Sequence, residues 1–178
     1  MTRLSGEFLS TLGEMSVEFV YLERVLHSAI SDVTSIETNL MDRLIATDSF
    51  EVLISKFNNI IIYKLHEYVT NKKQLEELKK ELKLLCKDIR DVGEQRNLLI
   101  HSLWFKNSDG ITIRQRFNRN IKEIPSFNEK EKFELQTELK SLKDFIVKIN
   151  KTINTVSSFT DKIIKLLSPQ IEVNNAKG

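Results

Sequence analysis

The chain has 178 residues, a length that favours one domain with enough apolar side chains to bury a core. Hydrophobic residues make up 40% and charged residues 29% of the sequence, the balance of a soluble globular protein. With only 5 Gly and 2 Pro the sequence has little material for many turns, which disfavours a β-sandwich or barrel, and the formal net charge of +2 gives no overall attraction for nucleic acid.

The number and spacing of cysteines and histidines indicate the compartment of the protein and the cofactors that it can hold. Cys86 is the one cysteine of the sequence, so no intramolecular disulfide can form, which is consistent with a reducing compartment. The histidines at 27, 66 and 101 lack the spacing of a zinc site. No stretch approaches the ~20 apolar residues that span a bilayer, and the N-terminus does not resemble a signal peptide. We therefore expect a cytoplasmic protein with no metal, no cofactor and no membrane partner.

Three helices are predicted in the first part of the chain, because apolar residues recur there at helical steps. They span about residues 6–31, 36–46 and 50–69. Three acids of the first helix, Glu14, Glu18 and Glu23, flank its apolar face. Each is a candidate partner for a buried arginine, and the alternative for each is an ordinary solvated acid.

The fourth predicted helix, from about residue 73 to 102, has an apolar seam with one interruption. The seam steps by three and four through Leu75, Leu78, Leu82, Leu85, Ile89 and Val92, and it resumes at Leu99 and Leu103. Between the two parts, where Leu or Ile is expected, stands Arg96. Because a guanidinium stays protonated, an arginine on a core-facing seam needs a counter-charge, acceptor oxygens or a water-filled groove.

A polar file runs along the second half of the same helix. Arg90, Gly93, Asn97 and His101 recur at helical spacing. Gly93 costs about 1 kcal/mol in mid-helix relative to Ala, which predicts a close approach of another backbone, such as a partner helix. Since the core of a monomer would not favour this file, we expect a homodimer with the file at or near its two-fold axis.

A β-hairpin is predicted after this helix, because residues 103–106 and 111–117 flank an Asp-Gly turn at Asn107–Gly110. Around the hairpin, basic residues outnumber the single acid Asp109. Together with Arg90, they are expected to contact RNA phosphates, the alternative being a solvated hairpin. These basic residues are Lys106, Arg114, Arg116, Arg119 and Lys122.

A last long helix is predicted from Asn128 to about Leu167. A kink or interruption is expected near residues 157–158 or 160–161, and Ser168–Pro169 is expected to end the helix. The predicted organisation is thus one domain over residues 1–169 followed by a flexible tail over 170–178.

The segment Arg96-Asn97-Leu98-Leu99-Ile100-His101 resembles the motif of the HEPN superfamily (higher eukaryotes and prokaryotes nucleotide-binding domain). That motif has an arginine, four to six residues and a histidine, and Asn97 supplies the polar residue that follows the arginine. With the predicted elements, the resemblance implies an all-α antiparallel bundle of about four to five helices with a small hairpin. It also implies a metal-independent endoribonuclease at a homodimer groove, in a toxin or phage-defence system, with a regulatory partner such as an antitoxin.

The chemistry of RNA cleavage without metal suits these residue types. The ribose 2′-hydroxyl must lose a proton, the leaving 5′-oxygen must gain one, and charge at the phosphate must be stabilised. His101 suits the proton transfers and Arg96 suits the charge. Asn97 would orient His101 or hold a phosphate. One arginine and one histidine supply only half of the acid, base and phosphate-binding groups that the reaction needs. A two-fold dimer that brings two motifs together would supply the rest.

Other interpretations remain open on the sequence. In one of them, Arg96 is a structural residue paired with an acid of the first helix, and His101 is a histidine at the helix end whose hydrogen bonds are satisfied. Alternatively, the chain is an inactive helical dimer that binds nucleic acid or protein. Catalysis requires that Arg96 and His101 open onto a shared groove that solvent reaches. A nucleotidyltransferase or phosphohydrolase is not supported, because the sequence has neither a glycine-rich phosphate loop nor paired metal-binding carboxylates.

Overall fold

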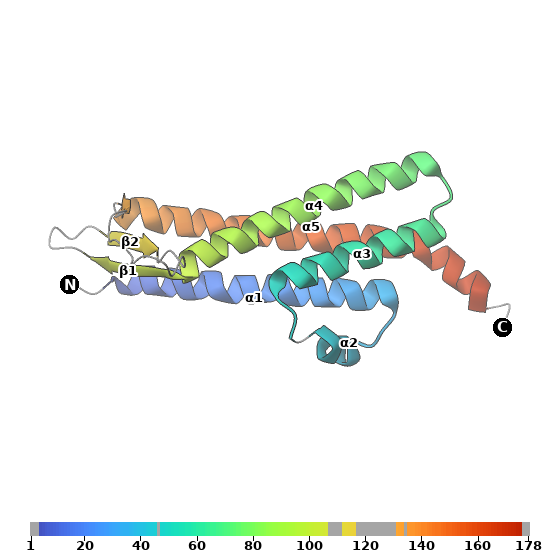
Figure 1. The fold of residues 1–178 in the computed structure, drawn as a ribbon, viewed down its shortest axis with the longest axis horizontal. Helices are drawn as coiled ribbons and strands as arrows, with labels where there is room; N and C mark the ends of the chain where they lie inside the picture. The colour runs from blue at the N-terminus through green and yellow to red at the C-terminus, as the bar shows by residue number, and fades with distance from the viewer. Residues whose placement is uncertain (1–3, 46, 107–111, 117–130, 134, 176–178) are drawn as a thin grey trace, which may run out of the picture.

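The computed structural model describes residues 4–45, 47–106, 112–116, 131–133 and 135–175. This part of the chain is mostly helical, as predicted (Figure 1). The helices are α1 (Gly6–Thr34), α2 (Thr38–Ile45), α3 (Phe50–Tyr68), α4 (Lys72–Ile100) and α5 (Leu135–Asn175). The strands are β1 (Ser102–Lys106), β2 (Thr112–Arg116) and β3 (Glu131–Phe133).

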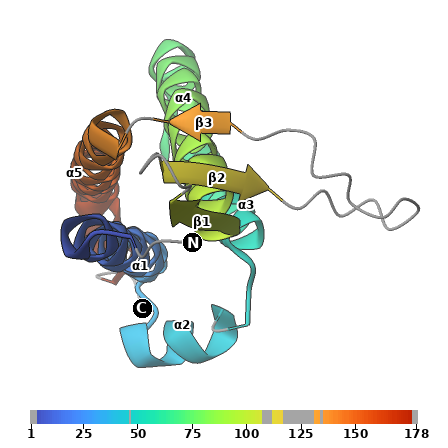
Figure 2. The same cartoon turned by 90° about the vertical axis from the view of Figure 1, so that its left-hand side faces the viewer.

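The four long helices lie side by side along the longest direction of the molecule (Figures 1 and 2). Helix α1 packs against α3 and α5, and α4 packs against the same two helices. The short α2 packs on α1 and projects from the other helices (Figure 2). Burying each large apolar side chain is worth about 1.5–3 kcal/mol, so the shared core holds the helices together. Its most deeply buried members include Phe8, Met15, Leu22, Leu26, Phe57, Ile61, Leu82, Ile89, Ile149 and Val156.

Short polar side chains fix where three helices begin. Ser5 accepts a hydrogen bond from the Phe8 N–H at 3.2 Å, and Ser49 accepts one from Val52 at 3.4 Å. Asn71 accepts from two N–H groups of the first turn of α4. These N–H groups have no partner inside their helix, so the caps set the boundaries that the apolar periodicity alone leaves uncertain.

The boundaries of α5 differ from those predicted. Residues 131–133 form β3, which pairs with β2, and the helix begins at Leu135 instead of Asn128. At the other end the helix continues past Pro169 to Asn175, so most of the predicted tail is helical. A proline keeps a helical φ and removes one N–H donor, so it can bend a helix without ending it, and the red end of α5 turns off the main axis (Figure 1).

The predicted interruption of α5 is also absent. Ser157 Oγ donates to the Ile153 carbonyl at 3.1 Å, and Thr160 Oγ1 donates to the Val156 carbonyl at 2.8 Å. These hydroxyls are satisfied by carbonyls one turn back in their own helix, and α5 continues through all four positions.

Strand β1 follows α4 directly, and the three strands form an antiparallel sheet in the order β1-β2-β3. Trp104 of β1 folds back, and its Nε1 donates to the Leu99 carbonyl at 2.9 Å. Its ring is tilted against Phe8 of α1, with centroids 5.1 Å apart. One side chain therefore fastens the sheet to the end of α4 and the start of α1. The predicted turn at residues 107–110 lies outside the described residues.

Within the part of the chain that the structure describes, no helix has both the length and the apolar character needed to cross a membrane.

Candidate active site

Arg96 lies near the C-terminal end of α4 and faces α1. Its Cζ is 5.1 Å from the centroid of the Phe19 ring, in cation–π range, and its Nη1 donates to Asn97 Oδ1 at 3.1 Å. Its Nε is buried and has no hydrogen-bond partner among the described residues. Arg96 is therefore a half-buried cation supported by an aromatic ring and still short of an acceptor, which is costly unless a charge lies nearby.

Gly93, one turn before Arg96, makes room for the support of that cation. A Cβ at Gly93 would lie 2.7 Å from both Cδ1 and Cε1 of Phe50. Phe50 in turn packs on Phe19, with ring centroids 4.7 Å apart. We call the pair Phe19–Phe50 the aromatic shelf. We predicted that another backbone, such as a partner helix, approaches Gly93. That prediction was wrong, because the side chain of Phe50 in the same chain fills the space.

Glu23 is the candidate acid that lies beside Arg96. Burial raises the pKa of the Glu23 carboxyl, and the positive charges of Arg96 and His27 partly offset that rise. The neighbourhood that catalysis would use therefore also holds an acid that Arg96 influences electrostatically, although no hydrogen bond or ion pair joins the two side chains in the described structure. The sequence offered three acids on one helix face, and only the position of Arg96 against α1 distinguishes them.

His101 lies at the surface at the end of α4. It is the C-cap residue, its φ is −91°, and its backbone N–H donates to the Asn97 carbonyl at 3.1 Å. Five helical positions place Arg96 and His101 roughly 140° apart around the axis and about 7.5 Å apart along it. No hydrogen bond or ion pair joins their side chains in the described structure; the Asn97 side chain bonds to Arg96, and His101 is reached only through the helix backbone.

The predicted RNA-binding residues have different surroundings. Arg90 Nε donates to Glu51 Oε1 at 2.8 Å, and this hydrogen bond raises the pKa of Arg90. Arg90 is thereby engaged with α3, away from the Asn97 and His101 end of the file. Three others lie in strands that follow the motif, and the last two lie outside the described residues. The strand residues are Lys106 in β1 and Arg114 and Arg116 in β2, and the two outside are Arg119 and Lys122.

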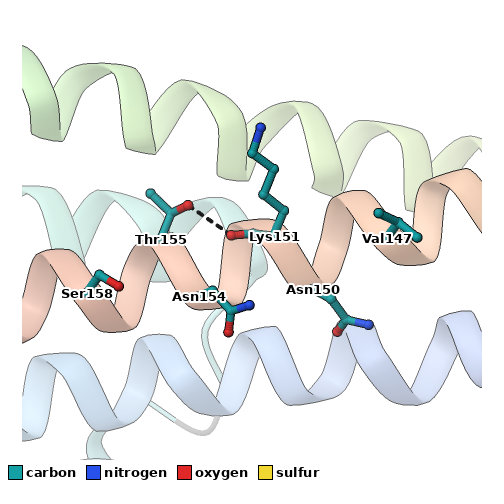
Figure 3. A pocket seen from close by; sticks show the side chains of 6 residues that line it. All are labelled: Val147, Asn150, Lys151, Asn154, Thr155 and Ser158. Carbon is teal, nitrogen blue, oxygen red and sulfur yellow. Dashed lines mark hydrogen bonds between the residues drawn. The ribbon is translucent and has the colours of Figure 1, made fainter.

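Two hollows lie along α5, away from the motif. The larger, about 550 Å³, is open, with Lys151 and Thr155 directed toward α4 and Asn150 and Asn154 toward α1 (Figure 3). The smaller, about 200 Å³, lies between α4 and α5 and shares Lys151 and Thr155 with it. Neither is lined by Arg96 or His101. Across the described residues no group of three His, Cys, Asp or Glu side chains could hold a metal ion.

Comparison with known proteins adds no assignment: no family model, no curated protein and no solved structure matches the chain. The interpretation of the site therefore depends on its own residues, Arg96, Asn97, His101 and Glu23.

Proposed function

We propose that the chain is a metal-independent endoribonuclease of the HEPN type, acting in a toxin or phage-defence system. In this proposal the long helices form an antiparallel HEPN-type bundle, and β1 and β2 are its small hairpin. The observation that carries the proposal is the arrangement at the end of α4. A half-buried Arg96 is bonded to Asn97, and His101 is exposed one turn further on.

Each residue has a role in the proposed reaction. A histidine accepts the proton of the ribose 2′-hydroxyl, whose oxygen forms a bond to phosphorus. The bond from phosphorus to the 5′-oxygen breaks as that oxygen takes a proton from a second acid. Arg96 meets the charge that builds on the phosphate oxygens, as a fixed cation already freed from much of its water. The products carry a 2′,3′-cyclic phosphate and a 5′-hydroxyl.

A homodimer supplies the second proton-transfer group in this proposal. His101 is exposed and can meet His101 of a second copy across a two-fold axis at this end of α4. The substrate phosphate would then lie between the two copies, reached by both motifs. Gly93 no longer argues for this dimer, so the exposed Asn97 and His101 carry the expectation.

A second candidate function is an inactive helical module that binds nucleic acid or protein. The electrostatic interaction between Glu23 and Arg96 favours it, because an acid near the arginine explains that cation without any reaction.

The two candidates are separated by three variants tested for RNA cleavage with a chelator present and for thermal stability. As a ribonuclease, the wild type cleaves single-stranded RNA, and His101→Ala and Arg96→Ala do not. His101→Ala melts close to the wild type, because an exposed side chain packs against little. His66→Ala is the matched control, since His66 is exposed on α3, and it should cleave normally.

The inactive module gives the reverse pattern. Arg96→Ala then removes the arginine from its place against Phe19 and Glu23 and destabilises the protein, while no variant changes a cleavage rate that is zero. A wild type inert on every RNA, with a badly destabilised Arg96→Ala, would exclude the ribonuclease.

A further inference from the structure

We infer that Trp104 is a positioning residue of this site: the hydrogen bond from its indole to the Leu99 carbonyl fixes the backbone that carries His101. The inference rests on the proposed ribonuclease function. It adds a residue of β1 that lies outside the segment from Arg96 to His101 and that acts through His101.

The two residues that would carry the chemistry are held in different ways. Arg96 is supported by the aromatic shelf and by Asn97, so side chains hold its guanidinium in place. His101 is exposed and directly follows the last residue of α4, so the position of its imidazole depends on the backbone at the helix end. A helix is least constrained there, because its last four carbonyls have no N–H partner within the helix. A histidine that transfers protons at this place needs a further restraint.

Trp104 supplies that restraint by replacing a missing helical donor. In a longer α4 the Leu99 carbonyl would accept from the N–H four residues later, but the chain leaves the helix and β1 begins at Ser102. The Trp104 Nε1 takes the place of that donor, 2.9 Å from the carbonyl oxygen. The backbone N–H of His101 itself donates to the Asn97 carbonyl at 3.1 Å. Hydrogen bonds to the last turn of α4 therefore hold the chain both at His101 and three residues after it.

The indole is in turn held by α1. Its ring lies at 60° to the ring of Phe8, with centroids 5.1 Å apart, and Phe8 is fully buried near the start of α1. A tilted aromatic pair stabilises beyond the area that it buries, so this packing keeps the Trp104 N–H directed at its acceptor. Trp104 thereby joins α1, β1 and the end of α4, which meet at one end of the molecule (Figure 1).

The reaction depends on this hydrogen bond more than the fold does. The packing on Phe8 and the ladder between β1 and β2 also hold the strand, so the fold survives without the bond. Proton transfer needs the imidazole within hydrogen-bond reach of the reacting oxygen, and a displacement of about 1 Å can cost roughly 100-fold in rate. Losing the bond should therefore lower the rate far more than it lowers stability or RNA affinity.

A tryptophan analogue removes the donor alone. Because Trp104 is the one tryptophan of the sequence, benzothienylalanine supplied in place of tryptophan changes this position only. Its ring has the shape of indole with sulfur in place of the N–H. We expect the analogue protein and Trp104→Phe to lose kcat roughly 10- to 100-fold, with KM changed by no more than about threefold. Their Tm should fall by only about 2–4 °C, as expected for one hydrogen bond in a domain of this size.

Ile163→Val is the matched control for stability. Ile163 is buried in α5 beside Lys162, which is paired with Glu81 in the first half of α4 and so lies far from His101. Removing one buried methylene destabilises a protein about as much as losing one hydrogen bond. This variant should therefore melt at a similar temperature to the analogue protein and keep the kcat of the wild type.

Hydrogen exchange of the His101 amide measures the backbone directly. Without the Trp104 donor the last turn of α4 should open more often, so this amide should exchange faster in the analogue protein and in Trp104→Phe. Exchange in Ile163→Val should match the wild type.

The experiment measures kcat and KM on single-stranded RNA, the melting temperature and the exchange of the His101 amide in these proteins and the wild type. The inference predicts a loss of kcat at nearly constant KM together with faster exchange, both confined to the two proteins without the donor. An active wild type whose kcat the analogue leaves unchanged, a KM that rises as much as kcat falls, or unchanged exchange at His101 overturns this inference alone. A wild type that cleaves no RNA overturns the proposed function and the positioning role of Trp104 with it.

Discussion

At the scale of single residues, two mid-helix glycines have opposite surroundings. Gly93 is buried against the Phe50 ring, whereas nothing lies within 4 Å of a Cβ built at Gly13. Gly93→Ala should destabilise the protein by about 1–2 kcal/mol, since overpacking outweighs the helix propensity gained. Gly13→Ala should stabilise it by about 0.5–1 kcal/mol, because only propensity and the unfolded state change. Urea unfolding of the two variants tests the pair, and equal effects would contradict the packing of Phe50.

The charge of Glu23 gives a second residue-scale prediction. Because burial raises its pKa in the folded state, its contribution to stability is fully present below the ordinary carboxyl range and is lost as the pH rises through the folded pKa. Glu23→Gln lacks this dependence. The stability of Glu23→Gln relative to the wild type should therefore increase from acidic to neutral pH and then stay constant. Unfolding free energies of both proteins over that range measure the difference, and a constant or falling difference would contradict it.

At this scale the sequence predicted that Arg96 needs a counter-charge, acceptor oxygens or a groove, since a cation interrupts an apolar seam, and the structure places Phe19 and Asn97 against it. It could not tell which acid Arg96 influences, because Glu14, Glu18 and Glu23 are equivalent until the end of α4 is placed beside α1. Gly93 was misread for a similar reason. Its cost in a helix indicates a close neighbour, but nothing in the local sequence identifies Phe50, more than 40 positions away along the chain, as that neighbour.

At the scale of the elements, periodicity located α1, α3 and α4 to within a few residues, because each is an amphipathic helix with a short polar cap. The start of α5 was missed because residues 131–133 form ladder hydrogen bonds with β2, a pairing that helical periodicity does not reveal. Its end was missed because a proline was taken to stop a helix that continues through it. The local apolar pattern cannot predict a helix boundary that is set by pairing with a distant strand or by a bend at a proline.

The strands after the motif carry the element-scale prediction. If Arg114 and Arg116 bind RNA phosphates, replacing both by Ala should weaken RNA binding and reduce the salt slope by about 0.7 for each phosphate of a single strand that is no longer neutralised. Binding titrations over a salt series measure the slope. Changing Lys72 and Lys73 to Ala is the control, because these exposed lysines begin α4 at its far end from the motif. Equal salt slopes for all three proteins would show that Arg114 and Arg116 of β2 do not bind RNA phosphates.

At the scale of the whole molecule, the proposed site needs two copies, since one chain keeps Arg96 and His101 on different sides of α4. Light scattering should report a dimer at micromolar concentration. Mixing inactive Arg96→Ala and His101→Ala chains should restore part of the cleavage if groups from both copies act on one phosphate. A stable monomer, or mixtures as inert as their components, would count against the shared groove.

The central claim is that this chain cleaves RNA without metal, using His101. The most direct measurement is the cleavage of single-stranded RNA by purified wild type in excess chelator, with analysis of the product ends, beside His101→Ala and His66→Ala. The account predicts fragments ending in 2′,3′-cyclic phosphate from the wild type and His66→Ala, and none from His101→Ala. An inert wild type, or equal cleavage by His101→Ala, would contradict it.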